Sequence, residues 1–466
     1  MKRSVGKLTK DRTASYNEYG LPKSLVDDIS RRGRIYEVGG TVRDRFISPG
    51  IEFKDRDFLV TSIPFNELTR LLKFHGRVGL VGKSFGVIKF TPRYKTVTYD
   101  IALPRKEISI GSGHKDFEVN FDHNLPVEVD LFRRDFTINS IAIDISSGAI
   151  IDPLGGRKDI RDKMIRTTSS NSFLDDPLRM LRAIQFAARF SFSIEPATLN
   201  EIKINHSLIN TVSAERIQEE LNKLLTRALE PSIGFRIMRD TGILKEILPE
   251  LQATVGIDQP GPYHRYDVFE HTMATIDNTP RRLPVRLAAL FHDISKPQTR
   301  ELVDEGATFY GHERKGAGIA RSVLKRLRYS KDIIDDVRIL VYRHMYTDKV
   351  TDKGLRRLIR NVGQERIFNL LDLRRADIIA QGRGLNVKQV DRFERRIREE
   401  LERKPPFTVK DLAINGYDLM ENFDLEESPI IGKILKYLLE YVLDNPEGNK
   451  REILLAKAKE FLDTTQ

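Results

Sequence analysis

The residues with the clearest chemical potential are Asp55 and Asp57, two carboxylates that enclose Arg56 just ahead of the apolar run Phe58–Val60. Side chains alternate between the faces of a strand, so both acids are expected on one face. Two like charges about 4 Å apart repel by roughly 4 kcal/mol at an effective dielectric near 20. A bound cation would relieve that repulsion, and oxygen-only ligands favour Mg²⁺. The pair predicts metal-dependent chemistry on a nucleoside triphosphate, although the tripeptide alone also suits a polar strand edge or turn.

A glycine turn precedes these acids in the chain. Ile35–Val38 is typical of a strand, Gly39-Gly40 of a tight turn, and Thr41 onward of a short helix. A glycine-rich turn that enters a helix presents backbone N–H groups to phosphate oxygens. Arg43, one turn into the helix, can add a charge-assisted contact. The segment therefore predicts a phosphate-binding turn.

A third carboxylate, Asp100, stands in the middle of a strand expected over residues 97–103. Burial of an unpaired carboxylate is costly, so Asp100 is expected to have a partner. That partner is either a metal ion or Arg105.

Two further segments carry paired charges. Leu131–Asn139 is typical of the start of a helix, with Arg134 and Asp135 on its polar side, although a surface ion pair worth at most ~1 kcal/mol is the ordinary alternative. Pro177 suits the first turn of another helix, which places Asp176 near the N-cap. Arg179 and Arg182 follow at a spacing of three and share a helix face with Asp176.

Histidines gather in the second half of the chain, where five of the nine fall within residues 264–344. His292 and Asp293 are adjacent at the end of the apolar run Leu287–Phe291, and three further histidines occupy neighbouring segments. These are His271, His312 and His344. An adjacent His-Asp pair with imidazoles from nearby helices can enclose divalent metals. One such histidine alone fits an ordinary polar contact, so the prediction of a metal site depends on the set.

Hydrophobic periodicity predicts how these residues are positioned. Short β-like runs alternate with turns early in the chain, and the sequence turns helical from about residue 160. Apolar spacings of three and four predict helices over Leu178–Phe190, Ala214–Leu229 and Ser232–Ile247. Pro405-Pro406 ends a late charged helix. The expected divisions are a flexible basic N-terminus at 1–21, an α/β head at 22–158, a helical neck at 159–254, a histidine-bearing body at 255–390 and a helical tail at 391–466. The predicted fold class is α+β multidomain, an α/β head followed by all-α segments.

Composition excludes several classes of protein. The chain has 466 residues, of which 40% are hydrophobic and 31% charged, as in a soluble protein of about two to four domains. No apolar run approaches the ~20 residues that span a bilayer, and the N-terminus lacks the apolar core of a secretion signal. Zero cysteines exclude disulfide-linked partners and thiolate metal sites. We therefore expect a cytoplasmic protein with no membrane partner.

The net charge of +11 and isoelectric point near 9.5 predict a polyanionic partner, with a charge that only aids solubility as the alternative. Basic clusters recur at 314–328, 353–360 and 392–404. Aromatic residues do not interleave them and the chain has no Trp. The pattern favours contact with a nucleic-acid backbone over the reading of single bases.

Six short motifs follow one another through the first 182 residues. They are Val38-Gly-Gly-Thr-Val-Arg-Asp44, Lys54-Asp-Arg-Asp57, Val81-Gly-Lys-Ser-Phe-Gly86, Arg133-Arg-Asp-Phe-Thr-Ile-Asn139, Ile151-Asp-Pro-Leu-Gly-Gly156 and Asp175-Asp-Pro-Leu-Arg-Met-Leu-Arg182. In this order and spacing the chain resembles the bacterial tRNA nucleotidyltransferases, the CCA-adding enzymes, a family that also includes bacterial poly(A) polymerases. The resemblance runs from about residue 22 to about residue 460. Most motifs are weak singly, but together they are specific.

The resemblance implies a template-independent enzyme that adds CMP and AMP, from CTP and ATP, to the 3′ end of tRNA with Mg²⁺ in its head. It implies catalysis by Asp55, Asp57 and Asp100, the first two as metal ligands. It implies nucleotide contacts by Gly39, Gly40, Arg43, Arg134, Asp135, Asp176, Arg179 and Arg182. In the family, residues matching Asp176 and Arg179 hydrogen-bond the edge of cytosine or adenine. The family usually has Glu-Asp where this chain has Asp175-Asp176.

The second half resembles an HD-domain metal phosphohydrolase, a module that many bacterial CCA-adding enzymes carry. His292-Asp-Ile-Ser-Lys296 stands where the pattern usually reads His-Asp-Ile-Gly-Lys. The resemblance adds Asp377 as a closing carboxylate to the five His and Asp residues above, around Mg, Mn, Ni or Fe. A phosphatase or cyclic phosphodiesterase acting on RNA ends is implied, and a degenerate domain that only supports tRNA is the alternative.

Related activities share these motifs. Partial CC-adding or A-adding enzymes and poly(A) polymerases remain alternatives to full CCA addition. A metal phosphohydrolase whose head only binds nucleotides is the alternative from another class. Residues 108–128 show no clear periodicity and are expected to be mobile, and in the family a flexible element in this region helps the change from C to A addition.

Overall fold

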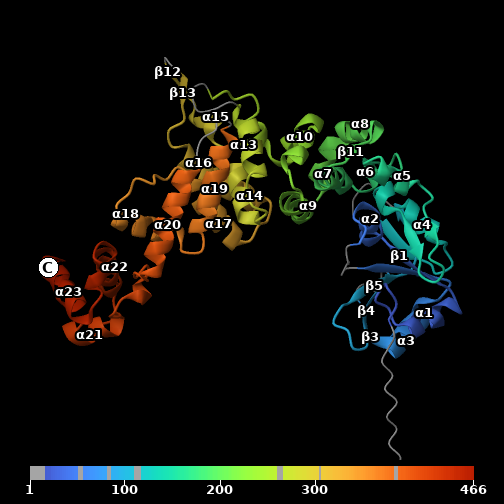
Figure 1. Ribbon diagram of the computed structural model, residues 1–466, viewed down its shortest axis with the longest axis horizontal. Coiled ribbons are helices and arrows are strands. Elements are labelled where there is room, and N and C mark those ends of the chain that lie inside the picture. The colour runs from blue at the N-terminus through green and yellow to red at the C-terminus, as the bar shows by residue number, and fades with distance from the viewer. Residues whose placement is uncertain are drawn as a thin grey trace, which may run out of the picture. The chain divides into compact units, whose positions relative to one another are not determined.

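The computed structural model describes residues 16–50, 56–80, 86–109, 117–259, 266–303, 306–381 and 387–465 (Figure 1). Asp55 and most of the expected N-terminal segment lie outside these ranges. The chain divides into two compact units, residues 1–220 with 236–247 and residues 221–235 with 248–466. A mixed sheet early in the chain and a largely helical remainder confirm the predicted fold class. The finer division into head, neck, body and tail stays a prediction.

A seven-stranded sheet organises the head, with strand order β3-β4-β5-β2-β1-β8-β9. Its members are β1 (Arg34–Val38), β2 (Asp57–Thr61), β3 (Gly76–Leu80), β4 (Val87–Pro92), β5 (Tyr99–Ala102), β8 (Ala142–Asp144) and β9 (Ile150–Ile151). Strands β2 and β5 are parallel neighbours, whereas the other ladders are antiparallel. The chain therefore crosses over between β2 and β5, which brings residues about 40 positions apart side by side.

The short helix α4 (Val127–Phe132) covers one face of this sheet. Its Val127 and Leu131 pack with Tyr36 and Leu59 in a buried core. Since side chains alternate along a strand, Asp57 projects from the same face as Leu59. Residues that follow α4 are thereby brought to the end of β2 that carries Asp57.

Other helices lie between residues 23 and 247. They are α1 (Lys23–Ser30), α2 (Gly40–Ile47), α3 (Phe65–His75), α5 (Gly156–Arg161), α6 (Ser172–Asp175), α7 (Leu178–Phe190), α8 (Pro196–Asn205), α9 (Ala214–Arg227), α10 (Ser232–Thr241) and α11 (Ile243–Ile247). The bounds of α7 match the expected ones. The helix expected over 232–247 is interrupted at Gly242, whose φ is +89°. A left-handed residue ends a helical turn, so two helices form there.

The segment predicted to be mobile contains regular structure. Strand β6 (Arg105–Ser109) pairs antiparallel with β7 (Phe117–Phe121), and α4 begins at Val127. The mobility of residues 108–128 stays a prediction. Backbone pairing, which hydrophobic periodicity alone does not report, stabilises both strands.

Among its described residues, the second unit is helical apart from one small hairpin, β12 (Glu301–Val303) with β13 (Gly306–Thr308). Its central helices pack side by side (Figure 1). They are α13 (Val268–Asp277), α14 (Leu283–Phe291), α16 (His312–Arg326), α17 (Lys331–Arg343) and α19 (Ile367–Ala380). Helices α18 (Asp352–Val362), α20 (Lys388–Glu402), α21 (Gly416–Phe423), α22 (Pro429–Asp444) and α23 (Arg451–Thr465) complete this unit. In the parts of the chain that are described, no helix has the length and apolarity needed to cross a bilayer.

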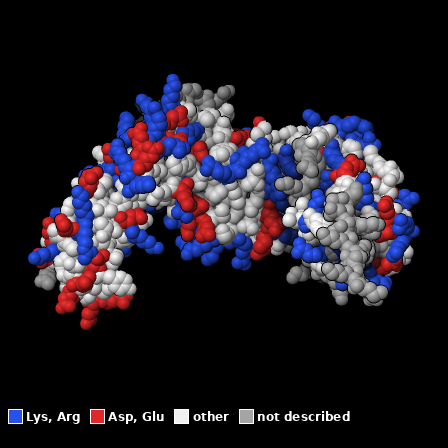
Figure 2. Space-filling model, turned by 60° about the horizontal axis from the view of Figure 1, so that its bottom comes forward, with Lys and Arg blue, Asp and Glu red and all other residues white. Residues whose placement is uncertain are grey.

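Charge is mixed on the visible surface. Figure 2 shows Lys and Arg side chains interspersed with Asp and Glu side chains over the face in view. The net charge of +11 is therefore not gathered into one basic patch on that face.

Candidate active site and metal centre

Two of the predicted acids meet across the crossover strands of the head. Asp57 begins β2, and the parallel ladder pairs it with Asp100 on β5. Paired residues of adjacent strands project from the same face, and the strands lie about 4.8 Å apart. Asp100 was expected to be buried, but its side chain is 40% exposed. It accepts a hydrogen bond from Lys89 Nζ at 2.7 Å. Asp55 lies outside the described residues, so its place beside Asp57 stays a prediction.

The predicted glycine turn lies directly beside Asp57. Gly39 has φ +82° and ψ −146°, a backbone region that is accessible almost only to glycine. A β-carbon at this position would lie 3.2 Å from Arg134 Nη1 and 3.3 Å from Asp57 Oδ2. Gly40 begins α2, as expected from the sequence. The turn, one acid and one arginine therefore form a single polar corner.

A buried carboxylate that the sequence did not indicate holds this arginine in place. Asp130 on α4 is fully buried, accepts from Arg133 Nε at 2.9 Å and from Arg134 Nη2 at 3.0 Å. Burial raises the pKa of Asp130, but the two guanidinium groups outweigh burial and the net pKa is lowered. In the sequence, the signal for this contact was that Asp130 stands three and four residues before Arg133 and Arg134. The helix expected to start at Leu131 instead ends at Phe132.

A second buried carboxylate lies on the opposite face of the sheet. Glu37 on β1 is fully buried and pairs with Arg56 Nη1 at 2.8 Å and with Arg45 Nη2 at 3.0 Å. Burial raises the pKa of Glu37 despite both partners. Arg56 immediately precedes Asp57, so this ion triad anchors the start of β2 from behind.

Arg43 is held by contacts within the protein. Its side chain is 5% exposed, donates to Asn139 Oδ1 and Asp44 Oδ1 at 2.7 Å each, and packs over the rings of Phe186 and Phe190. Burial lowers the pKa of Arg43, and Asp44 offsets part of that effect. Residues far along the chain therefore cover the guanidinium, and its contact with a phosphate stays a prediction.

The predicted base-reading residues stand at the start of α7. Asp176 Oδ1 accepts from the backbone N–H of Leu178 at 3.2 Å, so Asp176 does help to cap the helix. Its Oδ2 accepts from Arg216 Nη2 at 2.8 Å. Arg179 donates to Ser172 Oγ and to the carbonyl of Arg133, both at 3.0 Å. Asp176 and Arg179 are both half-buried and are held in fixed orientations.

Asp135 is buried and pairs with the half-buried Arg182, so the two do not form an exposed ion pair. Arg182 donates to Asp135 Oδ2 through Nε at 2.9 Å and Nη2 at 2.6 Å, and Asn139 donates to Asp135 Oδ1 at 2.8 Å. Burial raises the pKa of Asp135, but Arg182 and Asn139 outweigh it and the net pKa is lowered. This pair links the segment after α4 to α7 and thereby positions Arg179.

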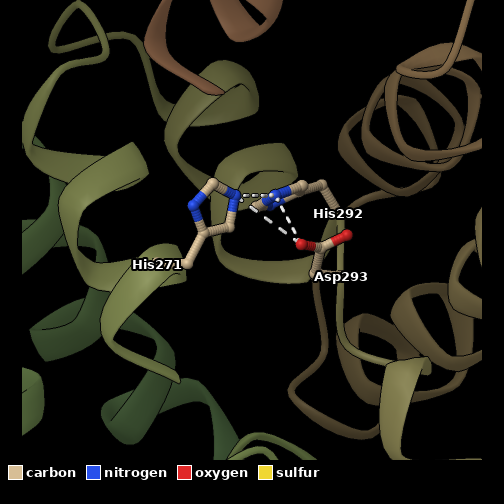
Figure 3. A group of neighbouring side chains, drawn as sticks. All are labelled: His271, His292 and Asp293. Carbon is tan, nitrogen blue, oxygen red and sulfur yellow. Dashed lines mark hydrogen bonds and ion pairs between the residues drawn. The ribbon is translucent and has the colours of Figure 1, made fainter. Parts of the chain in front are cut away.

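The predicted histidines and aspartates of the second unit do converge. We call them the His–Asp cluster: His271, His292, Asp293, His312, His344 and Asp377. All six are buried. Helix α13 carries His271, whose Nε2 lies 3.1 Å from Asp377 Oδ1 and 3.3 Å from His292 Nε2. Figure 3 shows the imidazoles of His271 and His292 directed at each other, with the Asp293 carboxylate turned towards both.

Asp293 is shared between two groups of possible metal ligands. Its Oδ2 lies 3.2 Å from His292 Nε2 and 3.7 Å from His271 Nε2. Its Oδ1 lies 3.5 Å from His312 Nε2 and 3.9 Å from His344 Nε2. One carboxylate therefore faces two histidine pairs, one with each oxygen.

Backbone hydrogen bonds fix the tautomers of three of these histidines. The Nδ1 atoms of His292, His312 and His344 lie 2.6–2.7 Å from backbone carbonyl oxygens, to which only an N–H can donate. In a neutral ring the Nε2 atom then carries a lone pair. His312 Nε2 and His344 Nε2 face each other at 3.1 Å, so two lone pairs oppose unless a cation or proton lies between them. Metal-binding histidines commonly donate their second nitrogen in this way.

The pKa of His344 agrees with a neutral imidazole in the cluster. Burial lowers the pKa of His344 to about 3. Burial also opposes charge on His292, but Asp293 outweighs it and raises that pKa. Lys296, the last residue of the His292-Asp-Ile-Ser-Lys296 motif and not among the predicted metal ligands, lies 2.6 Å from Asp293 Oδ2. Its spacing of three residues from Asp293 was the available signal.

Known protein families match three separate parts of the chain. The family described as poly(A) polymerase head domain matches residues 35–166, the RNA- and SrmB-binding region of polymerase A matches 191–254, and tRNA nucleotidyltransferase domain 2 matches 316–458. The multifunctional CCA protein of Methylobacillus flagellatus is 38% identical over 318 residues, 67% of this chain and 73% of that protein. Its counterpart in Burkholderia mallei is 32% identical over 382 residues, 78% and 88% of the two chains. This chain belongs to the CCA-adding tRNA nucleotidyltransferase family.

Solved CCA-adding enzymes share the fold. The Bacillus stearothermophilus CCA-adding enzyme in complex with CTP is 22% identical, with a TM-score of 0.68 over 95% of this chain and 97% of that one. The Thermotoga maritima CCA-adding enzyme complexed with tRNA is also 22% identical, with a TM-score of 0.53 over 94% and 93%. Family membership confirms the resemblance drawn from the six motifs, and it makes the chain a nucleotidyltransferase.

Proposed function

We propose that the chain adds CMP and AMP, from CTP and ATP, to the 3′ end of tRNA, and so completes or repairs the CCA sequence. The observation that carries this proposal is the pairing of Asp57 with Asp100 beside Gly39 and Arg134. Relatives named multifunctional CCA proteins support it. We propose the cytoplasm as its location, as expected for an enzyme that acts on tRNA.

The head acids fit a magnesium ion. Asp57 and Asp100 are partly exposed, project from one face and offer oxygen ligands only, the donor set that Mg²⁺ prefers. Asp55, two residues from Asp57, would complete the ligand set. When bound, the metal supplies charge neutralisation at the triphosphate and activation of the attacking hydroxyl.

The chain's own residues bind and orient the reactants. The 3′ hydroxyl oxygen of the RNA attacks the α-phosphorus, and the bond to pyrophosphate breaks. Arg134, held by Asp130, and the N–H groups at the start of α2 face the triphosphate. Asp176 and Arg179 hydrogen-bond the base edge, where a carboxylate acceptor beside a guanidinium donor distinguishes cytosine and adenine from guanine and uracil. Arg182 and Asp135 position them.

A primer-extension assay tests this proposal. tRNA transcripts that end before CCA and after CC are incubated with CTP and ATP, separately and together, and product lengths are read on a gel. We expect completion of CCA and no further growth. Ladders of many A residues would indicate a poly(A) polymerase, and addition of only C or only A a partial enzyme. Asp57→Asn should abolish incorporation, whereas Asp162→Asn, at an exposed acid, should not; an unchanged rate in Asp57→Asn refutes the assignment.

We also propose that the His–Asp cluster binds divalent metal, Mg, Mn, Ni or Fe, as in HD-domain phosphohydrolases, and hydrolyses phosphate esters. Opposed Nε2 lone pairs around Asp293 support it. His271 and His292 with Asp377, and His312 with His344, would hold the metal on either side of Asp293. When bound, the metal supplies a nucleophilic hydroxide at neutral pH. Metal analysis after reconstitution tests this: His292→Ala should bind less metal than wild type, and a wild-type protein that binds none refutes it.

A further inference from the structure

A large cavity opens onto the His–Asp cluster within the second unit. Its volume is 1610 Å³, above the roughly 300–1,000 Å³ of common small-molecule sites. Residues of β13 and the start of α16 line part of it, and residues of α19 and α20 line another part. The His–Asp cluster lines only part of this cavity. The cavity therefore has room for a substrate larger than one phosphate group.

Basic side chains outnumber acidic ones among the residues that line the cavity and do not belong to the cluster. Six lysine and arginine side chains line it, against three carboxylates outside the cluster. The six are Lys296, Arg374, Lys388, Arg392, Arg395 and Arg398. Lys388, Arg392 and Arg395 follow one another at spacings of four and three on α20, so they share one helix face. This face presents a row of positive charge to the cavity.

Two of these arginines are uncommitted. Arg374 donates to Asp377 at 2.8 Å, and Arg398 donates to Glu394 at 2.9 Å. By contrast, Arg392 and Arg395 are exposed and make no hydrogen bond or ion pair within the described ranges of the chain. The neighbouring carboxylates Asp391 and Glu394 accept hydrogen bonds from Arg375. Among the described residues, they are not paired with Arg392 or Arg395.

An exposed aromatic side chain lies on the part of the cavity wall formed by β13 and the start of α16. Tyr310, between β13 and α16, is 83% exposed and lines the cavity with Phe309. Lys296 Nζ lies 5.4 Å from the centre of the Phe309 ring, so Phe309 is already in contact with a cation. Tyr310 is thus the ring that offers an open face for stacking, and base–aromatic stacking is a common means of holding single-stranded RNA.

We propose that this cavity takes the phosphorylated 3′ end of an RNA strand and that α20 makes it prefer a strand over a mononucleotide. The inference rests on the proposed phosphohydrolase function. The terminal phosphate lies at the His–Asp cluster, the terminal base stacks on Tyr310, and the next internucleotide phosphate lies on Arg392 and Arg395. A mononucleotide leaves the α20 arginines without a partner. For a 2′,3′-cyclic phosphate, water oxygen bonds to phosphorus, one P–O bond to the ribose breaks, and a proton passes to the released ribose oxygen.

The test compares two substrates in the full-length, Mn²⁺-loaded protein. One is 2′,3′-cyclic AMP, and the other is an adenosine trinucleotide that ends in a 2′,3′-cyclic phosphate. We expect Arg392→Gln/Arg395→Gln to lower kcat/KM for the trinucleotide by about tenfold, as for the loss of a charge-assisted phosphate contact. The value for cyclic AMP should stay within about twofold. Tyr310→Ala should lower both values, because both substrates carry the terminal base.

A matched variant and a binding assay make the outcome decisive. Arg321→Gln/Lys325→Gln removes the same charge from an exposed face of α16 outside the cavity and should leave the substrate ratio unchanged. Fluorescence anisotropy then measures the affinity of a labelled trinucleotide 3′-phosphate. If no substrate is hydrolysed but the α20 double variant binds about tenfold more weakly, the phosphohydrolase proposal fails and the strand-end site stands. Equal losses for both substrates, or unchanged trinucleotide affinity, overturn the inference.

Discussion

Substitution of Gly39 by alanine is the sharpest test of the head geometry. The backbone of Gly39, at φ +82° and ψ −146°, costs an alanine about 1–3 kcal/mol of strain. The added β-carbon would also lie 3.2 Å from Arg134 Nη1 and 3.3 Å from Asp57 Oδ2, closer than ordinary van der Waals contact. Both side chains must therefore move by a few tenths of an ångström.

This movement acts on catalysis beyond its effect on stability. A displacement of reacting groups by about 1 Å lowers rates by roughly 100-fold, so a few tenths of an ångström should lower the rate by about tenfold. We expect Gly39→Ala to lose about 1–3 kcal/mol in the free energy of unfolding and about tenfold in the single-turnover rate of CMP incorporation. Urea denaturation measures the first quantity, and quench-flow on a tRNA transcript that lacks CCA measures the second.

The matched control is Gly148→Ala. Gly148 also has a positive φ, +71°, but an added β-carbon would meet no atom within 4 Å. It should lose stability through backbone strain and keep its incorporation rate. If the two variants incorporate CMP at the same rate, the crowded corner of Gly39, Arg134 and Asp57 plays no part in the reaction.

Three further outcomes follow from buried groups. Glu37→Gln should lower the free energy of unfolding by about 1–3 kcal/mol and slow CMP incorporation. The reason is that Arg45 and Arg56 lose a buried partner but keep some solvent contact. Calorimetry that shows no change in stability contradicts the anchoring role. Folding lowers the pKa of Asp130 below its unfolded value of 3.8, so its stabilisation is complete above that pH and is lost as the pH falls below it. The stability difference between wild type and Asp130→Asn should therefore shrink on acidification, and a constant difference would be the contrary result. His344→Ala should lower the number of Mn²⁺ ions bound per chain by about one, as measured by mass spectrometry.

Local pattern was enough to predict several elements. Strand β1 and helix α7 lie where periodicity and the flanking Gly and Pro residues placed them. The six residues of the His–Asp cluster were also gathered correctly, five of them by their clustering along the chain and Asp377 by resemblance. These features depend on residues that are close in sequence or on a motif that is specific.

Features set by distant residues were not predictable. Lys89 pairs with Asp100 because β4 and β5 are antiparallel neighbours in a register that periodicity does not specify. Arg43 is covered by Phe186 and Phe190, more than 140 residues further along the chain. An exposed arginine and a buried one have the same local pattern, so only the folded chain distinguishes a ligand contact from a structural one.

The parallel ladder between β2 and β5 also affects when the enzyme becomes competent during its synthesis. Asp57 leaves the ribosome well before Asp100, and neither has its partner until the crossover has folded and the central strands have paired. Such long-range pairing forms late in folding because loop closure comes first. A half-made or misfolded head therefore has no assembled acid pair with which to consume nucleoside triphosphates.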